Sequence, residues 1–287
     1  AEHESVSLRE LCYYTGVTRS VAEALQSKGA VDFYDHVVFR NPYGDVKPEP
    51  SSAVILNEMQ QRAFQTLSAL LEHPEKPALL YGVTGSGKTQ VYLSLIERCL
   101  RMGKAAMVLV PEISLTAQTL ETFHSRFGGQ VAVLHSGLSL GERMDEWRRI
   151  KEGQAQIVLG TRSAVFAPVR NLGLLVIDEE QEHTYQSDKT PRFHARDIAR
   201  LRCRYHKALL LLASATPSVE SYHAAQTGRY ELVELGQRYG SQPLPQVEIV
   251  DMRQGENLSD TPSLSLLLRE ELLYNLERGQ QSILLLN

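Results

Sequence analysis

Residues 81–89 read Tyr81-Gly82-Val83-Thr84-Gly85-Ser86-Gly87-Lys88-Thr89, which fits the pattern G-x-x-x-x-G-K-[ST]. The apolar residues 77–81 predict a buried strand, and residues 89–96 carry apolar side chains at helical spacing. A glycine-rich turn between a strand and a helix directs backbone N–H groups at one point, beside the positive end of the helix dipole. The stretch therefore predicts a phosphate-binding loop.

Each polar residue of this loop has an expected role. Lys88 is expected to reach the β- and γ-phosphates of ATP, and the Thr89 hydroxyl to hold Mg²⁺. Glycines let the backbone wrap a polyphosphate without Cβ clashes. The expected nucleotide-binding residues of the loop are Gly82, Thr84, Gly85, Ser86, Gly87, Lys88 and Thr89.

A second stretch complements the loop. Residues 174–177 are apolar and lead into Asp178-Glu179-Glu180-Gln181. At a strand end opposite a phosphate-binding loop, Asp178 can hold Mg²⁺ and Glu179 can orient and polarise an attacking water. We therefore expect a catalytic centre that includes Lys88, Asp178 and Glu179.

Apolar segments alternate with helical patterns along most of the chain. Strands are predicted at 77–81, 106–110, 131–134, 156–159, 174–177 and 208–212, and helices at 56–71, 114–127, 140–152 and 195–207. This alternation favours an α/β fold with a doubly wound parallel sheet that helices cover on both faces.

The chain divides into four predicted parts. Residues 1–41 have the order helix (8–12), turn, helix (20–28) and hairpin (31–39), which is typical of a small winged-helix domain. Because acidic residues outnumber Lys and Arg there, a structural or protein-contact module fits as well as a DNA reader. We expect a linker at 42–52, the nucleotide-binding lobe at 53–236, and a connector with the start of a second lobe at 237–287. In that last part we predict a helix at 264–278 and a strand at 282–287, which suggests a chain that continues.

Composition sets wider bounds. The 287 residues are 43% hydrophobic and 22% charged, which is ordinary for a soluble globular protein. We see no apolar run near the roughly 18 residues of a membrane span and no signal peptide, and the three cysteines lie far apart. These features predict a cytoplasmic protein without membrane contact. The net charge of −4 neither indicates nor excludes nucleic-acid binding.

Residues 182–207 follow the acidic strand end and have the composition of a single-strand binding loop. Tyr185 and Phe193 lie among Lys189, Arg192 and Arg196. Aromatic rings stack on unpaired bases, and cations hold phosphates. The strand end Ser214-Ala215-Thr216 adds small hydroxyls that could link the nucleotide site to a distant surface by hydrogen bonds.

The phosphate-binding loop, the acidic strand end and the Ser-Ala-Thr strand end follow one another along the chain. In this order, they resemble the motifs of the superfamily 2 helicases. Residues 56–60 look like the family's adenine-reading segment, with Gln60 as the reader, and residues 110–116 and 160–166 look like its single-strand contact motifs. Within that superfamily, residues 135–139 and 185–197 are most similar to the helicases of replication restart. That branch usually has histidine where this chain has Gln181, whose amide can still sense a γ-phosphate by hydrogen bonding.

The resemblance implies a RecA-like lobe of an ATP-dependent 3′-to-5′ DNA helicase that acts at replication forks in primosome assembly. It implies ATP and Mg²⁺ as cofactors, single-stranded and forked DNA as partners, and contacts with primosome and single-strand-binding proteins. Catalytic residues are then Lys88, Asp178, Glu179 and Gln181. The residues that contact DNA or couple it to ATP are then Thr161, Arg162, Tyr185, Arg192, Phe193, Arg196, Ser214 and Thr216.

The resemblance also implies parts that would follow Asn287, namely a cysteine-rich zinc insert and a second lobe that supplies an arginine to the ATP site. Zinc is expected only there. By themselves, residues 1–287 are then expected to bind ATP weakly and hardly to hydrolyse it. Two alternatives stay open: a double-strand DNA translocase of the same superfamily, and a nucleotide-controlled DNA-binding module that does not unwind.

Overall fold

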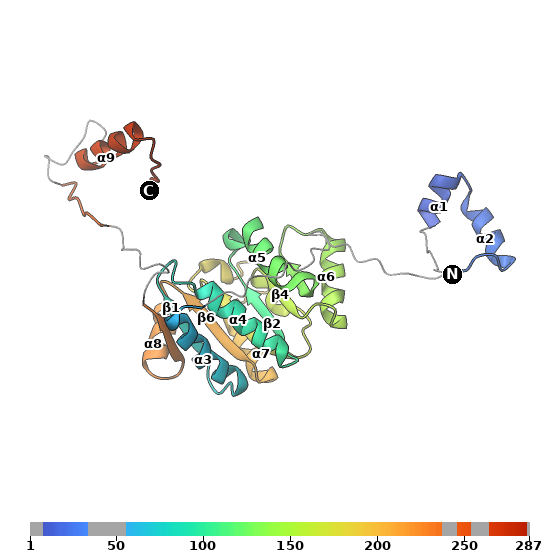
Figure 1. Cartoon of the computed structure of the whole chain (residues 1–287), viewed down its shortest axis with the longest axis horizontal. Helices are drawn as coiled ribbons and strands as arrows, with labels where there is room; N and C mark the ends of the chain where they lie inside the picture. The colour runs from blue at the N-terminus through green and yellow to red at the C-terminus, as the bar shows by residue number, and fades with distance from the viewer. Residues whose placement is uncertain (1–7, 34–55, 237–245, 254–263, 286–287) are drawn as a thin grey trace. The chain divides into compact units, whose positions relative to one another are not determined.

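The computed structural model describes residues 8–33, 56–236, 246–253 and 264–285 (Figure 1). The chain divides into two compact units, Ala1–Tyr239 and Gly240–Asn287. Within the described ranges, none of the helices combines the length and the apolar character that a transmembrane segment requires.

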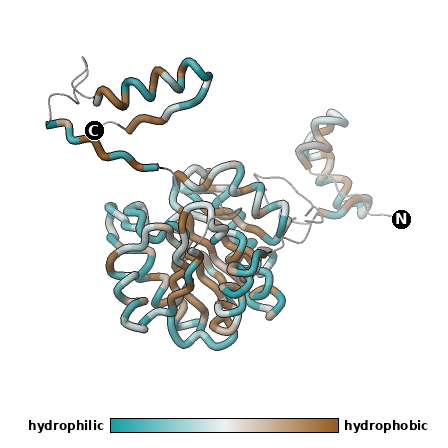
Figure 2. Tube along the Cα trace, turned by 60° about the vertical axis from the view of Figure 1, so that its left-hand side comes forward, coloured by the Kyte–Doolittle hydropathy of each residue, from teal (hydrophilic) through white to brown (hydrophobic). Residues whose placement is uncertain are grey.

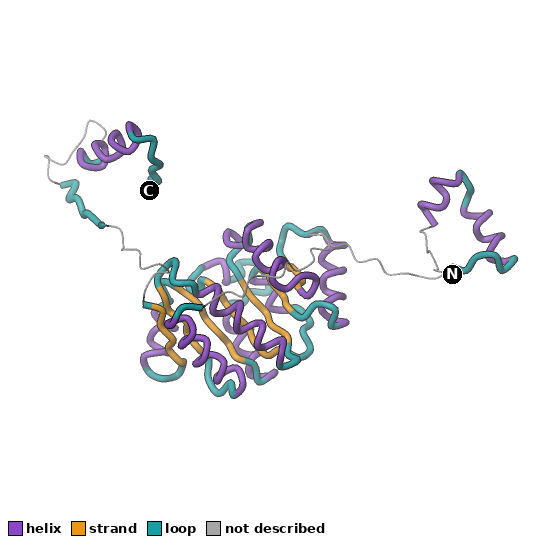
Figure 3. Tube along the Cα trace, viewed as in Figure 1, coloured by secondary structure: helices purple, strands orange, loops and turns teal. Residues whose placement is uncertain are grey.

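A parallel sheet of seven strands forms the centre of residues 56–236 (Figure 3). The strands are β1 (Ala78–Gly82), β2 (Ala105–Leu109), β3 (Val131–Leu134), β4 (Ile157–Gly160), β5 (Leu172–Asp178), β6 (Leu209–Ser214) and β7 (Glu231–Leu235). Their order is β3-β4-β2-β5-β6-β1-β7, and every neighbouring pair is parallel. All carboxyl ends therefore meet at one edge, where β1 leads into the glycine-rich loop, β5 ends at Asp178 and β6 ends at Ser214.

Helices cover both faces of this sheet. The first face carries α3 (Glu58–Glu72), α4 (Lys88–Arg101) and α5 (Ala117–Phe127), and the second carries α6 (Leu140–Glu152), α7 (Ala195–His206) and α8 (Val219–Gln226). Successive strand residues point to opposite faces. In β2, Val108 packs in the core under the first face, whereas Met107 and Leu109 pack in the core under the second. Hydrophobic stretches accordingly gather inside the lobe (Figure 2). The prediction of a doubly wound α/β lobe is confirmed.

Capping residues determine where two helices begin. At α3, the Asn57 side chain accepts from the Gln60 N–H over 2.9 Å, and Gln60 Oε1 accepts from the Asn57 N–H over 3.0 Å. Ser139 and Glu142 form the same reciprocal pair at the start of α6. Each pair satisfies two N–H groups that have no partner within the helix.

Three elements differ from the sequence prediction. The helix predicted at 114–127 begins three residues later, at Ala117, because Glu112–Ser114 forms a 3₁₀ turn (η1) and Thr116 caps α5 through its hydroxyl. The sequence analysis missed α8 and β7. Both are short, and β7 is an edge strand in which exposed Glu234 lies between buried Val233 and Leu235. An alternation over so few residues is a weak signal.

The N-terminal part contains α1 (Leu8–Thr15) and α2 (Arg19–Ser27), in agreement with the two predicted helices. The predicted hairpin at 31–39 lies outside the described residues except for 31–33, which have no regular secondary structure. The predicted linker at 42–52 lies entirely outside them. The winged-helix assignment therefore stays a prediction.

The C-terminal unit contains α9 (Leu266–Glu277), close to the helix predicted at 264–278. The strand predicted at 282–287 is wrong over residues 282–285, which have no regular secondary structure, while 286–287 lie outside the described residues. A strand requires a neighbouring backbone as a hydrogen-bond partner. Here Ile283 and Leu285 are exposed instead.

Candidate nucleotide site and adjoining loop

The glycine-rich loop joins β1 to α4 at the carboxyl edge of the sheet. Gly85 and Gly87 have φ values of +80° and +84°, which side chains of L-residues rarely adopt. A Cβ atom on Gly87 would also lie 2.1 Å from Nε2 of Gln60, so a larger residue here would both strain the backbone and displace the Gln60 amide. The loop therefore follows the close, glycine-dependent course that the motif predicts.

The side chains of the loop fit a phosphate ligand. Ser86 Oγ is buried, with no hydrogen-bond partner among the described residues. Lys88 Nζ is buried as well and donates to the Gly82 carbonyl over 2.7 Å. Burial lowers the pKa of the Lys88 ammonium, whereas Glu179 and Asp178 raise it. An unpaired hydroxyl and a lysine at the N-terminus of α4 are suited to an anion, so the polyphosphate of ATP fits this loop.

Asp178 ends β5 and is held through both carboxylate oxygens. Oδ2 accepts from the Tyr92 hydroxyl over 3.0 Å, and Oδ1 accepts from the Glu179 N–H over 3.0 Å. Burial raises the pKa of Asp178, while the hydrogen bond from Tyr92 and the charge of Lys88 lower it. Lys88 and Thr89 begin α4, and both Lys88 and Tyr92 interact electrostatically with Asp178. The structure thus brings the two expected Mg²⁺ ligands, Thr89 and Asp178, to the same site.

A line of hydrogen bonds runs from Glu179 to the end of β6. Glu179 Oε2 accepts from Gln181 Nε2 over 2.9 Å, and Gln181 Oε1 accepts from the Ser214 hydroxyl over 2.6 Å. The Thr216 N–H in turn donates to Ser214 Oγ over 2.9 Å. Glu179 has φ +45°, a conformation that costs energy for a residue other than glycine and is concentrated at functional sites. A carboxylate in strained backbone is therefore linked to Thr216, which is exposed.

Gln60 lies beside the loop rather than on the surface. Its side chain is 2% exposed, Oε1 accepts within the cap of α3, and Nε2 donates to the Ser86 carbonyl over 3.0 Å. Both ends of the amide thus bind the protein and connect α3 to the loop. The role of Gln60 in reading adenine stays a prediction.

Tyr185 is a core residue. Its side chain is 1% exposed, and its hydroxyl lies 2.5 Å from the carbonyl oxygen of Asp178 and 3.0 Å from that of Leu109. A base cannot stack on an enclosed ring, so the single-strand stacking expected from composition does not apply to Tyr185 in this structure. Its hydroxyl instead contacts the end of the strand that carries Asp178.

Arg196 also points inward. Its guanidinium forms an ion pair with buried Glu180 over 2.8 Å and donates to the hydroxyls of Ser218 and Ser221. Glu180 Oε1 accepts from the Ser218 N–H over 2.7 Å at the start of α8. The expected contact of Arg196 with DNA phosphates is therefore replaced here by a contact between α7, α8 and the strand end.

The remaining predicted DNA residues lie around a short hairpin. Gln186 and His194 form an antiparallel bridge, and residues 188–192 between them, with Arg192, are exposed. Phe193 packs edge-on against the half-exposed Phe166, with the ring centroids 4.9 Å apart. Arg162 donates to the backbone carbonyls of Thr184 and Gln186 at the base of this hairpin, and Thr161 is buried.

The structure adds two residues that the sequence analysis assigned no role. Glu180 was interpreted only as part of the acidic run, and its position directly after Asp178 and Glu179 gives no sign that its side chain points away from theirs. Tyr92 lies in the apolar face predicted for residues 89–96, where a tyrosine is expected to be an ordinary core residue. Its hydroxyl contact with Asp178 depends on the packing of α4 against β5, which no local pattern encodes.

A family model described as DEAD/DEAH box helicase matches residues 57–225, which include the loop, Asp178–Gln181 and the end of β6. This range is more than half of the chain. The chain belongs to the DEAD/DEAH box helicase family. The helicase resemblance drawn from the motifs is confirmed.

This helicase-family chain is similar to curated proteins named replication restart protein PriA. It is 43% identical to that of Bacillus subtilis (strain 168) over 290 residues, which cover 100% of this chain and 36% of the relative. It is 44% identical to that of Treponema pallidum (strain Nichols) over 232 residues, which cover 81% of this chain and 34% of the relative. The chain thus spans about a third of the length of these relatives.

Among solved structures, this helicase-family chain is similar to RecG bound to a three-way DNA junction. The TM-score is 0.50 at 22% identity, over 79% of this chain and 27% of the other. At this identity the likeness shows a shared fold, in agreement with the RecA-like lobe expected from the sequence.

Proposed function

We propose that this chain supplies the ATP-hydrolysing lobe of a DNA helicase of replication restart. The observation that carries this proposal is the hydrogen-bonded line from Glu179 through Gln181 to Ser214 and Thr216. It connects the carboxylate suited to activating water with an exposed strand end. Similarity to proteins named for replication restart supports the choice of process.

In the proposed reaction, Mg²⁺–ATP supplies the phosphoryl group that is transferred to water. Lys88 is a fixed cation beside the glycine-rich loop and would stabilise the charge of the β- and γ-phosphates. Thr89 and Asp178 would hold Mg²⁺ through their side-chain oxygens. Glu179 accepts the proton of the attacking water, and the amide of Gln181 keeps that carboxylate oriented.

Coupling to DNA follows from the same contacts. A shift of Gln181 at the nucleotide site changes its bond to Ser214, and thereby the backbone at Thr216. Tyr185 links the Asp178 carbonyl to the hairpin that carries Arg192 and Phe193. We propose that single-stranded DNA lies against this hairpin, the half-exposed Phe166 that packs on it, and the exposed Thr216. Movement with 3′-to-5′ polarity, action at forks, and contacts with primosome and single-strand-binding proteins belong to this proposal as well.

The test is ATP hydrolysis by a protein that carries residues 1–287 together with a second motor lobe, measured with forked DNA, blunt duplex or no DNA. The proposal predicts hydrolysis that forked DNA stimulates most. Equal stimulation by blunt duplex would instead support a double-strand translocase. Binding of DNA and nucleotide without any hydrolysis would support a nucleotide-controlled DNA-binding module.

A further inference from the structure

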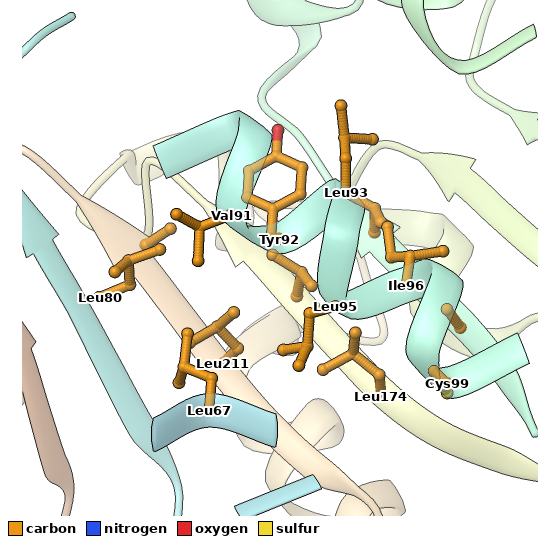
Figure 4. Packing of buried hydrophobic residues seen from close by; sticks show 14 of the residues in the cluster. Leu67, Leu80, Val91, Tyr92, Leu93, Leu95, Ile96, Cys99, Leu174 and Leu211 are labelled. Carbon is orange, nitrogen blue, oxygen red and sulfur yellow. The ribbon is translucent and has the colours of Figure 1, made fainter. Parts of the chain in front are cut away.

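Tyr92 lies on α4 one helical turn beyond Thr89, so both side chains are on the same face of that helix. The tyrosine is 2% exposed and belongs to the core under the first face of the sheet. Figure 4 shows its ring beside Val91 and Leu95, with the hydroxyl directed away from the apolar cluster. Packing therefore fixes the ring and leaves one polar atom at the border between the core and the nucleotide site.

The Tyr92 hydroxyl contacts Asp178 at a well-defined place. It donates to Oδ2 over 3.0 Å, while Oδ1 accepts from the Glu179 N–H over 3.0 Å. The carboxylate is thus held at both oxygens, by a side chain of α4 and by the backbone that follows β5. Because each carboxylate oxygen has two lone pairs, each retains one for a further ligand.

The phenol also interacts with the other expected Mg²⁺ ligand. Thr89, three residues earlier on α4, lies within side-chain hydrogen-bond reach of the Tyr92 hydroxyl. The hydroxyl therefore adjoins both expected ligands. It lies between Thr89 at the start of α4 and Asp178 at the end of β5.

We propose that Tyr92 is a positioning residue that holds Thr89 and Asp178 in the arrangement that binds Mg²⁺ with the nucleotide. This inference rests on the nucleotide function proposed above and adds a residue that lies outside the motifs of the loop and of the acidic strand end. Groups that hydrogen-bond to metal ligands orient them, and their loss typically costs about 10- to 100-fold in metal affinity or activity.

A purely structural role makes a different prediction. If Tyr92 only satisfies a buried carboxylate, loss of its hydroxyl lowers the stability of the lobe and leaves the metal dependence of nucleotide binding unchanged. If Tyr92 positions the ligands, the loss affects binding with Mg²⁺ and spares binding without it. The second pattern follows because residues 82–88, which would hold the phosphates, form no hydrogen bond with the Tyr92 hydroxyl in the described part of the chain; Lys88 donates to the Gly82 carbonyl instead.

The experiment uses residues 1–287 with the Tyr92→Phe substitution, which keeps the ring and removes the hydroxyl. Binding of a fluorescent, slowly hydrolysed ATP analogue is titrated with Mg²⁺ and, separately, in EDTA. We expect the Mg²⁺ concentration for half-maximal enhancement of binding to rise about tenfold or more. The affinity in EDTA should change by less than about twofold. Tyr92→Met, which also lacks the hydroxyl, serves as a second variant if the first does not fold.

Tyr230→Phe is the matched control, because Tyr230 is also buried, and its hydroxyl contacts Arg200, away from the nucleotide site. It should leave the Mg²⁺ dependence unchanged. An unchanged Mg²⁺ dependence in a folded Tyr92 variant would overturn the inference, and so would an equal loss of affinity with Mg²⁺ and in EDTA. If the unsubstituted chain bound no nucleotide under either condition, the proposed nucleotide function would fall, and this inference with it.

Discussion

The nucleotide end of the sheet and the segment that follows it, residues 182–196, differ in how their side chains are used. At the nucleotide end, Lys88, Asp178 and Glu179 lie at the same edge, as their motifs predict. In the following segment, the aromatic and basic residues do not share one surface. The side chains of Tyr185 and Arg196 point into the protein interior, whereas Arg192 is exposed.

This difference follows from what each pattern encodes. A glycine-rich loop between a strand and a helix fixes the course of the backbone, so the positions of its side chains follow from the spacing. A mixture of aromatic and basic residues encodes no backbone course. Tyr185 has a carbonyl to bind, and Arg196 has a buried carboxylate to neutralise. Both residues therefore contribute to the scaffold of the nucleotide site, and the proposed DNA surface is left to their neighbours.

Arg196→Ala tests whether Arg196 stabilises the fold from the interior. It should have the largest effect of the substitutions considered, a loss of stability. Removing the guanidinium leaves Glu180 buried without its ion-pair partner, which costs about 3–5 kcal/mol in such cases. We expect the free energy of unfolding to fall by about that amount in urea titrations followed by circular dichroism. Arg192→Ala is the control and should leave stability unchanged. Adding Glu180→Gln to Arg196→Ala removes the unpaired charge and should recover part of the lost stability. If Arg196→Ala were as stable as Arg192→Ala and the unsubstituted chain, the ion pair between Arg196 and Glu180 would not support the fold.

Glu179→Gln tests the nucleotide side. It keeps the size of the side chain and removes the base, so hydrolysis should fall by about 10²-fold or more while ATP affinity is retained. Steady-state hydrolysis and nucleotide binding are measured in a protein that carries this chain and a second motor lobe. Loss of affinity in parallel with turnover would make Glu179 a binding residue and would contradict the role given to it here.

Tyr185→Phe separates a buried scaffold role from base stacking. Loss of the hydrogen bond at the Asp178 carbonyl should lower the free energy of unfolding by about 1 kcal/mol, because the ring keeps its packing. Single-strand affinity, measured by fluorescence anisotropy, should stay the same. Tyr185→Ala discriminates further: if DNA affinity fell by about 1–3 kcal/mol in a variant with unchanged stability, the ring would meet bases after all.

Arg192→Ala should have the smallest effect of these substitutions, and that effect should be limited to DNA binding. An exposed arginine that binds a phosphate contributes about one unit to the slope of log affinity against log salt. We expect that slope to decrease by about one for single-stranded DNA, with no change in hydrolysis without DNA. Asp188→Asn, in the same exposed hairpin tip, is the control. An unchanged slope would remove Arg192 from the DNA surface.

Most of the lobe follows from sequence pattern, and the exceptions have physical causes. Buried parallel strands are continuous apolar runs, which is why β3 and its neighbours were found within two residues of their bounds. The edge strand β7 is half-exposed and loses that signal. At the site, motifs located the loop, Asp178 and Ser214. They could not give the direction of Tyr185 or the contact from Tyr92, because each depends on which residues the packed sheet places nearby.

The central claim is that residues 56–236 bind Mg²⁺–nucleotide through the loop after β1. Its most direct test compares residues 1–287 with their Lys88→Ala variant in the binding of a slowly hydrolysed ATP analogue, with Lys189→Ala in the exposed hairpin as a control. We expect saturable binding by the unsubstituted chain and by Lys189→Ala. Lys88→Ala should weaken binding about 10- to 100-fold, the scale of a lost hydrogen bond to a charged group, with unchanged unfolding. Equal affinities of the folded proteins for the nucleotide, or no binding by any of them, would contradict the account.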